Sequence, residues 1–195
     1  MECIVSRFLM SPKSAEPLRV RHRLVHDALI LAALDPDVRA IEAAPVEIAG
    51  TPAPVDVIVL GRTDGRFVLD VPEAHPRDLD AAGLALLAIE SLNLPTLSFP
   101  APDIRRQPRW SNAVLVWDAR AVRVPVDARV QVLAALAEAG TLTLHEAAQA
   151  TGLVRGPVSA VLALACADLL AIDLDDGPLG PETRVRRIPS REDAR

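Results

Sequence analysis

Asp56 and Asp70 are the two acidic residues whose positions in this 195-residue chain suggest chemistry. Asp56 follows Pro54-Val55 at the start of an apolar run, and Asp70 lies fourteen residues later in Leu69-Asp70-Val71-Pro72. The turn signal Thr63-Asp64-Gly65 between them predicts a β-hairpin, so both carboxylates can face the same side at the edge of a sheet. Carboxylate oxygens suit Mg²⁺ and Mn²⁺, which can activate water at a phosphodiester. The pair therefore predicts a metal site, with a strand-start residue and a strand-end cap as the structural alternative.

The first predicted helix offers a third ligand for that metal. His22 and His26 are four residues apart and can share one face of the helix. His26 would complete a set with Asp56 and Asp70, and its imidazole would favour Mn, Fe or Zn over Mg. The alternative is a solvated helix face that the histidines share with Arg19, Arg21 and Arg23.

Basic side chains that can contact phosphates gather at two places in the sequence. The first is a cluster just before Trp110, formed by Arg105, Arg106 and Arg109. This cluster fits either a phosphate grip or a solvated loop whose Trp packs between two modules. The second group lies nearer the C-terminus, where the candidates are Arg155, Arg184 and Arg186.

The N-terminal half predicts a mixed α/β sheet of element order αβββαβ. After a loosely held lead-in over residues 1–17, apolar spacing predicts a helix over 18–34. Strands follow at 40–48, 55–60 and 66–71, then a helix over 77–92 and a strand over 96–99. The first domain therefore spans 18–100, and an Arg- and Trp-containing connector with a further strand at 113–116 covers 101–118.

Residues 119–190 predict a second, smaller domain of winged-helix type, followed by a tail over 191–195. A helix over 127–139 ends at Gly140, and the capping box Thr143-Leu144-His145-Glu146 opens a second helix. Gly156-Pro157 opens a third helix, and two strands around a Gly/Pro tip complete a hairpin. The third helix of such a domain reads DNA bases. Here it is almost wholly apolar after Arg155, so it fits a protein partner or a dimer interface at least as well.

At these residues the chain resembles the PD-(D/E)XK nuclease superfamily, and more specifically the TnsA-type endonucleases, in which a nuclease domain precedes a winged helix. Pro54-Val55-Asp56 stands where the family has Pro-Asp, with one residue inserted, and Asp70-Val71-Pro72 stands where it has acid-any-Lys. Asp35-Pro36-Asp37-Val38 is similar to the family's helix-to-strand passage, and His26 or Asp27 falls where the first helix often offers a Glu. Over about residues 18–190, the resemblance implies a restriction-endonuclease-like fold with Asp56 and Asp70 as its catalytic acids.

The lysine of the family motif is missing. Its position holds Pro72, and the chain has no lysine other than Lys13. In the family, that lysine orients the water and stabilises developing negative charge, an electrostatic role that dominates such chemistry. An arginine from Arg62, Arg66 or Arg77 could lie nearby, but its high pKa prevents it from acting as a general base. The resemblance therefore implies a degenerate active site.

Composition limits the remaining functions. The net charge of −5 and the pI near 5.4 argue against a general polyanion binder, and 3% aromatic residues argue against a base-stacking platform. Two distant cysteines, Cys3 and Cys166, fit a reducing compartment, and no apolar run is long enough to span a bilayer. We therefore expect a soluble cytoplasmic protein without a membrane partner.

The combined expectation is a DNA-associated accessory protein with little or no phosphodiesterase activity, on a TnsA-like scaffold of the transposon type. Two alternatives stay open from the sequence. One is an active endonuclease that uses Mg or Mn in an atypical site. The other is a protein-interaction module of a mobile element or a defence system.

Overall fold

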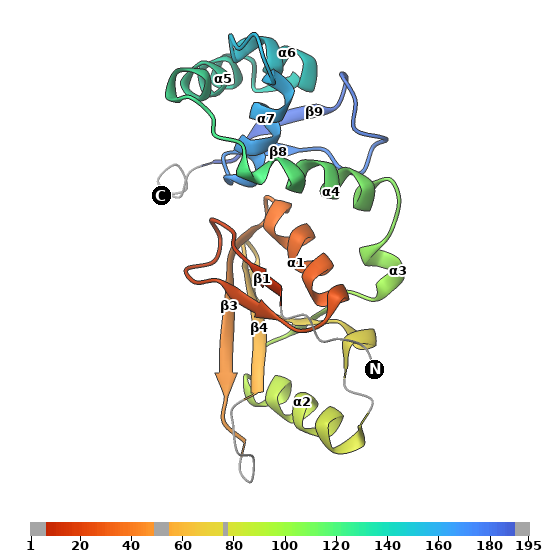
Figure 1. Ribbon diagram of the computed structural model, residues 1–195. Helices are drawn as coiled ribbons and strands as arrows, with labels where there is room; N and C mark the ends of the chain where they lie inside the picture. Colours follow the sequence, from red (N-terminus) through yellow and green to blue (C-terminus); the bar gives the residue numbers. More distant parts are fainter. Residues whose placement is uncertain (1–6, 49–54, 76–77, 190–195) are drawn as a thin grey trace. The chain divides into compact units, whose positions relative to one another are not determined.

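Two units make up the chain in the computed structural model, which describes residues 7–48, 55–75 and 78–189. The first unit comprises residues 1–33 and 37–105, and the second comprises residues 34–36 and 106–195 (Figure 1). The main boundary falls inside the predicted connector, so residues 106–118 belong to the second unit. Pro54, Arg77, Cys3 and the predicted tail over 191–195 lie outside the described residues. No described helix has the length and apolar character needed to cross a membrane.

A four-stranded mixed sheet forms the centre of the first unit, which confirms the predicted α/β class. Its order is β3-β4-β5-β6, with β3 at Val38–Val46, β4 at Val55–Arg62, β5 at Gly65–Asp70 and β6 at Thr96–Ser98. The first three strands are antiparallel neighbours, and the hairpin at Thr63-Asp64-Gly65 forms as predicted. Strand β6 runs parallel to β5, which requires a crossover, and helix α2 (Leu79–Ser91) supplies it.

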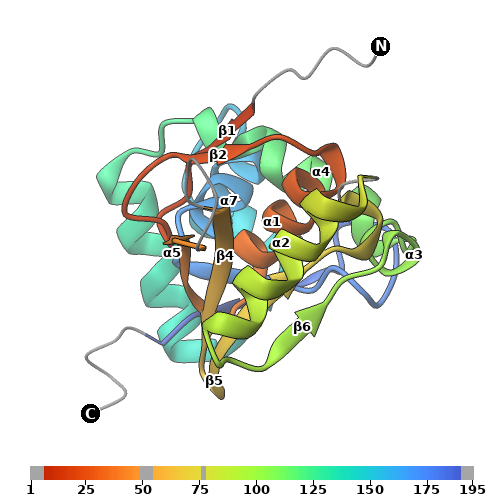
Figure 2. The same ribbon diagram turned by 90° about the horizontal axis from the view of Figure 1, so that it is seen from below.

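Helix α2 packs on one face of this sheet, where it contacts β4 (Figure 2). Its one buried residue, Ala88, joins a core cluster with Val46, Val57 and Val68. These three valines come from three adjacent strands and alternate with residues that face the other way. Burial of this valine face holds the hairpin and the crossover helix together.

The segment before α1 corrects the prediction of one helix over 18–34. Strand β2 (Leu18–Val20) occupies its start, and α1 begins only at Arg23 and ends at Leu34. Leu18 and Val20 are buried while Arg19 between them is exposed, which is the two-residue alternation of a strand. The partner of β2 is β1 (Arg7–Leu9), in an antiparallel two-stranded sheet.

Residues 7–17 are not the loosely held lead-in that was predicted. Leu9 is 1% exposed, and the hydroxyl of Ser14 donates to the carbonyl of Ser11 while accepting the Ser11 backbone N–H. The carbonyl of Lys13 accepts the N–H of Ile41 in β3. The segment is therefore held to the sheet by this backbone hydrogen bond as well as by its buried side chains.

Three helices and a three-stranded antiparallel sheet form the centre of the second unit. The helices are α5 (Val126–Ala139), α6 (Leu144–Ala150) and α7 (Pro157–Cys166). The strands are β7 (Thr141–Thr143), β8 (Leu170–Ile172) and β9 (Arg184–Arg187), in the order β7-β9-β8. Helix α5 ends at Gly140 with φ 75°, and Pro157 takes the first position of α7, both as predicted.

Thr143 is at once the last residue of β7 and the N-cap of α6. Its hydroxyl accepts the N–H of Glu146, and the Glu146 carboxylate accepts the N–H of Thr143 at 2.8 Å. The predicted capping box is thereby confirmed. The backbone N–H of Thr143, and after it the Thr143 hydroxyl, which donates to Oε2 of Glu146 at 2.9 Å, hold the pKa of the Glu146 carboxyl below its ordinary value.

Helix α4 (Arg109–Asp118) stands where a strand over 113–116 was predicted. Its buried residues include Ala113, Val116 and Trp117, at the three- and four-residue spacing of a helix. The prediction was wrong because a short apolar run does not by itself distinguish a strand from a helix. A short helix α3 (Ala101–Ile104) precedes α4, and the 3₁₀ helix η2 (Ala119–Ala121) follows it.

Candidate functional site

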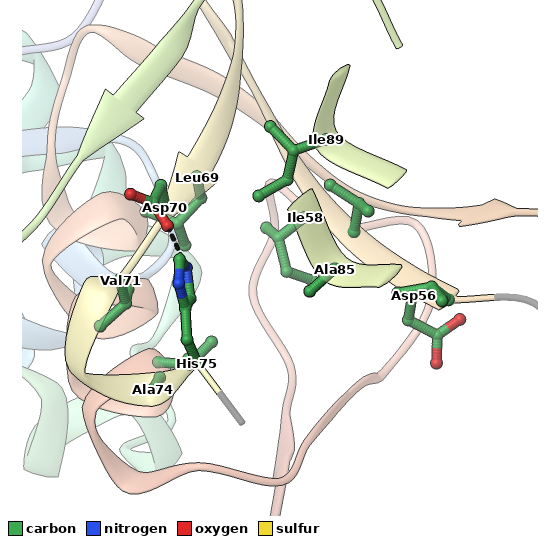
Figure 3. Close-up of a pocket in the computed structure, with 12 residues that line it drawn as sticks. Asp56, Ile58, Leu69, Asp70, Val71, Ala74, His75, Ala85 and Ile89 are labelled. Atoms are coloured by element: carbon green, nitrogen blue, oxygen red, sulfur yellow. Dashed lines mark hydrogen bonds and ion pairs between the residues drawn. The ribbon is translucent and has the colours of Figure 1, made fainter. Parts of the chain in front are cut away.

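A pocket lies in the first unit where β4 and β5 part. Their ladder runs from the Arg62–Gly65 pair at the turn to the Val59–Val68 pair, after which β5 continues beside β6. The pocket at the parted strand ends has a volume of about 170 Å³, and both motif acids line it (Figure 3). The rest of the lining is mostly hydrocarbon, from Val25, Ile58, Leu69, Val71, Ala85 and Ile89.

Asp70 lies at the end of β5 and is bonded to a histidine. Its Oδ1 atom is 2.6 Å from Nε2 of His75, and the two side chains are 16% and 31% exposed. The 3₁₀ helix η1 (Pro72–Ala74) reverses the chain directly after the strand and so returns the ring to the carboxylate. Pro72, at the motif's lysine position, is the first residue of that turn. The structure therefore places an imidazole, and no lysine, beside Asp70.

Asp56 lies at the other end of the same pocket (Figure 3). It is exposed and sits opposite Pro45 in the ladder between β3 and β4. The pairing of β4 with β5 ends at Val59 and Val68, so both acids lie beyond it, on the parted ends of the two strands. There Asp70 pairs with Ser98 of β6. The two carboxylates line one pocket from opposite ends and do not point toward each other (Figure 3).

His26 does not join the two acids. Its ring is half-buried on α1, where Nδ1 is buried without a hydrogen-bond partner and lies 3.9 Å from Oδ1 of the buried Asp27. His22 has a local role, because its Nδ1 accepts the N–H of Leu24 at the start of α1. Only Val25 reaches the pocket from this helix.

The predicted metal set of Asp56, Asp70 and His26 is not assembled. Across residues 7–48, 55–75 and 78–189, no three His, Cys, Asp or Glu side chains gather as metal ligands would. The Asp70–His75 pair can instead orient one ring nitrogen and hold or release a proton at the other. Sequence reasoning missed His75 as a site residue, although its position five residues after Asp70, beyond a Pro-initiated turn, was a usable signal.

The three arginines of the predicted phosphate-binding cluster are divided between the two units, and two of them face a carboxylate. Arg105 belongs to the first unit, whereas Arg106 and Arg109 belong to the second. Within the second unit, Nη2 of Arg106 donates to Oδ1 of Asp175 at 2.5 Å, and Nε of Arg109 lies 4.0 Å from Oδ2 of that residue. These two guanidinium groups therefore face a carboxylate of their own unit.

The loop that carries Asp175 is held by hydrogen bonds from its backbone to the side chain of Asp173. Oδ1 of Asp173 accepts the N–H groups of Asp175 and Asp176 at 3.0 and 3.3 Å. These bonds, the one from Asp175 first, hold the pKa of Asp173 below its ordinary value, and the nearby Arg184 adds to the effect. The loop thus presents its carboxylates in fixed positions.

Asn112 of α4 fastens this loop with both ends of its amide. It is 2% exposed, and its Nδ2 donates to the carbonyls of Leu174 and Gly177 at 2.9 and 2.7 Å. Its Oδ1 accepts the N–H of Leu179 at 2.9 Å. Three backbone groups more than sixty residues away in sequence are therefore satisfied by one side chain.

Helix α7 is buried along most of its length. Every residue from Ala160 to Cys166 is at most 8% exposed, and the helix packs against α6, α4 and η2. The thiol of Cys166 donates to the carbonyl of Val116 in α4 at 3.1 Å, and burial raises its pKa to about 11. The apolar side chains from Ala160 to Cys166 are therefore covered within their own unit and offer no partner surface, whereas Val158 in the first turn is 43% exposed.

Arg155, Arg184 and Arg186 are exposed. Arg155 precedes α7, while Arg184 and Arg186 lie on β9, the middle strand of the small sheet.

The chain matches no protein-family model, and no curated protein matches it.

Proposed function

We propose that this chain is a DNA-associated accessory protein on a TnsA-like nuclease scaffold that has lost phosphodiester cleavage. The observation that carries the proposal is the parting of β4 and β5. It brings both motif acids to one pocket, where the resemblance expects an active site, but it leaves their carboxylates apart. The position of the site is retained under this proposal, while its chemistry is not.

Support for the scaffold comes from element order. The first unit follows helix α1 with three antiparallel strands, a crossover helix and a parallel strand, as in the predicted αβββαβ order. The second unit follows α5 with β7, α6, α7 and the β8–β9 hairpin, an order compatible with a winged helix. Both orders fit the resemblance, and fold alone does not choose between binding and cleavage.

Support for lost cleavage comes from Asp70 and its surroundings. A metal ion would have to bind Asp70 through Oδ2 or displace His75, because Oδ1 is held by His75 at 2.6 Å. Pro72 carries neither a donor nor a charge for the transition state. Catalysis by the family's mechanism therefore lacks its lysine, and His75 competes with a metal ion for one oxygen of Asp70.

A plasmid assay tests the loss of cleavage. Supercoiled DNA incubated with the protein and Mg²⁺ or Mn²⁺ is expected to show no more nicking than with the Asp70→Ala variant. A second variant, Pro72→Lys, is expected to remain inactive, because restoring the cation does not bring Asp56 toward Asp70. Nicking that depends on metal and on Asp70 would contradict the proposal.

A separate assay tests the association with DNA. Fluorescence anisotropy of a labelled duplex is expected to show binding at low salt that weakens steeply as salt is added, since arginine–phosphate contacts release counterions. The absence of binding at low salt would contradict this half of the proposal.

An active endonuclease with an atypical site is the second candidate, and the Asp70–His75 pair is the observation that favours it. A histidine oriented by a carboxylate can act as a general base. This candidate predicts metal-dependent nicking that is lost in both His75→Ala and Asp70→Ala. Equal nicking by these variants and the wild type would trace the activity to a contaminant.

A further inference from the structure

Helix α7 is the element that a winged helix would place in the major groove, but here α4 covers it. The groove is about 12 Å wide and admits one α-helix, whose own diameter is about 10–12 Å. Helix α4 packs against α7, and Cys166 is bonded to Val116 across the contact. Ala160 to Cys166 are all buried, so only the first turn of α7, over Pro157 to Ser159, is open, and Ser159 is the one exposed polar side chain there.

Helix α4 is held over α7 by hydrogen bonds, so moving it away would cost free energy. Asn112 of α4 makes three hydrogen bonds to the loop before β9. Lifting α4 would leave Leu174, Gly177 and Leu179 with unsatisfied backbone groups, each at a cost of about 1–3 kcal/mol if it stayed buried. Arg106 also holds the same loop through Asp175.

The outer face of the sheet β7-β9-β8 presents two exposed arginines side by side on its middle strand. Val185 is fully buried, so Arg184 and Arg186 on either side of it point outward together. They lie two residues apart, on the order of 7 Å along the strand. Because β9 pairs on both edges, the backbone that carries them is held in place.

The neighbours of these two arginines differ in charge. Arg186 lies opposite Thr141 on β7 and Ala171 on β8, so its nearest cross-strand neighbours are uncharged. Arg184 lies opposite Thr143 and faces the carboxylate of Asp173. An anion that approaches this face therefore meets its least compensated positive charge at Arg186, beside the hydroxyl-bearing Thr141.

We infer that the second unit contacts duplex DNA through Arg184 and Arg186 on the outer face of this sheet, which bind backbone phosphates, and that α7 reads no bases. This inference rests on the proposed DNA association and names its surface. Such contacts are independent of base sequence, since phosphates are the same at every step. The surface is small, in keeping with a protein whose net charge is −5.

The test compares matched arginine variants of the full chain on labelled duplexes of two unrelated sequences. For Arg184→Ala/Arg186→Ala, we expect affinity to fall on the order of tenfold and the salt slope to fall by about 1.8, because each phosphate contact contributes about 0.9. The control is Arg123→Ala/Arg129→Ala, which removes the same charge from exposed positions outside the sheet. Of the single variants, Arg186→Ala should lose more affinity for the duplex than Arg184→Ala.

The remaining outcomes separate this inference from the proposal beneath it. If the wild type binds no duplex at low salt, the proposed DNA association fails. If it binds and Arg155→Ala weakens binding more than the β9 double variant does, α7 reads the groove and the inference is overturned. A clear preference between the two duplex sequences, or equal losses in the β9 variant and its control, would overturn it as well.

Discussion

Helices α2 and α7 are both rich in Ala and Leu but have very different surroundings. Helix α2 also carries Asp80 and Glu90, whereas no residue of α7 is charged. In α7 every residue from Ala160 to Cys166 is buried, whereas in α2 only Ala88 is, and Leu79, Leu86 and Leu87 are 50% to 86% exposed. Apolar composition therefore predicts what a helix can bury but does not tell how many neighbours it has.

The difference comes from the number of elements packed around each helix. Helix α2 lies on one face of a sheet, so only one side of it is covered. Helix α7 lies between α6 on the one hand and α4 with η2 on the other. A helix with neighbours on several sides has no polar face, which explains why no residue of α7 is charged.

The same substitution in the two helices gives the largest expected contrast. Leu164→Ala in α7 removes a side chain that is 2% exposed and is expected to cost about 2–5 kcal/mol of unfolding free energy. Urea unfolding followed by tryptophan fluorescence measures this cost, because both tryptophans, Trp110 and Trp117, belong to the second unit. A loss below about 1 kcal/mol would show that α7 is not enclosed.

Removing the side chain that holds α4 in place is expected to have the next largest effect on stability. Asn112→Ala deletes three hydrogen bonds to the loop before β9 and is expected to cost about 2–3 kcal/mol, measured in the same way. Ser111→Ala is a suitable control, since Ser111 is exposed on the same helix and bonded only to Gln107 within its own segment. Equal effects of the two variants would contradict the role assigned to Asn112.

The Cys166 thiol gives a smaller effect that depends on pH. Burial raises its pKa to about 11 in the folded state, against 9.0 for an ordinary thiol. The unfolded chain therefore loses this proton first, and the stability of the second unit should decline between about pH 9 and pH 11. In a Cys3→Ser background we expect a decline of roughly 1–2 kcal/mol over that range.

Cys166→Ala is the control for this decline. It removes the ionisable group, so the part of the pH dependence that comes from the thiol should disappear. If both proteins lose stability in parallel above pH 9, the thiol is not the cause, and the contact between α7 and α4 is looser than described.

Leu87→Ala in α2 is expected to have the smallest effect. The side chain is 54% exposed, so its loss should change stability by less than about 0.5 kcal/mol. Far-UV circular dichroism during urea unfolding is the measurement, since the first unit holds no tryptophan. A cost comparable to that of Leu164→Ala would mean that another surface covers α2.

Local signals account for the parts of the fold that were predicted correctly. The turn at Thr63-Asp64-Gly65 and the capping box of Thr143 with Glu146 depend on residues within a few positions of one another. The strand predicted over 113–116 failed because the burial of Ala113 and Val116 is set by α7, which is distant in sequence. A short apolar run is consistent with either structure until its neighbours are known.

The candidate site was predicted in position but not in geometry. Both acids line one pocket, yet the side each faces depends on a register that changes sides with every residue. The turn sets the pairing from Arg62 and Gly65 as far as Val59 and Val68, but both acids lie beyond that ladder, where the turn no longer determines which way they point. The bond from His75 to Asp70 depends on how η1 folds, which the residue types alone do not determine.

Thr143 ends a strand and caps a helix, and this double position leaves no spare residue between β7 and α6. An inserted residue would break either the ladder to Arg184 or the cap to Glu146. The joint therefore fixes the angle at which the chain leaves the sheet. Extra length, a fused tag or a new chain terminus belongs at exposed turns elsewhere, and this joint is the place where the second unit would accept none.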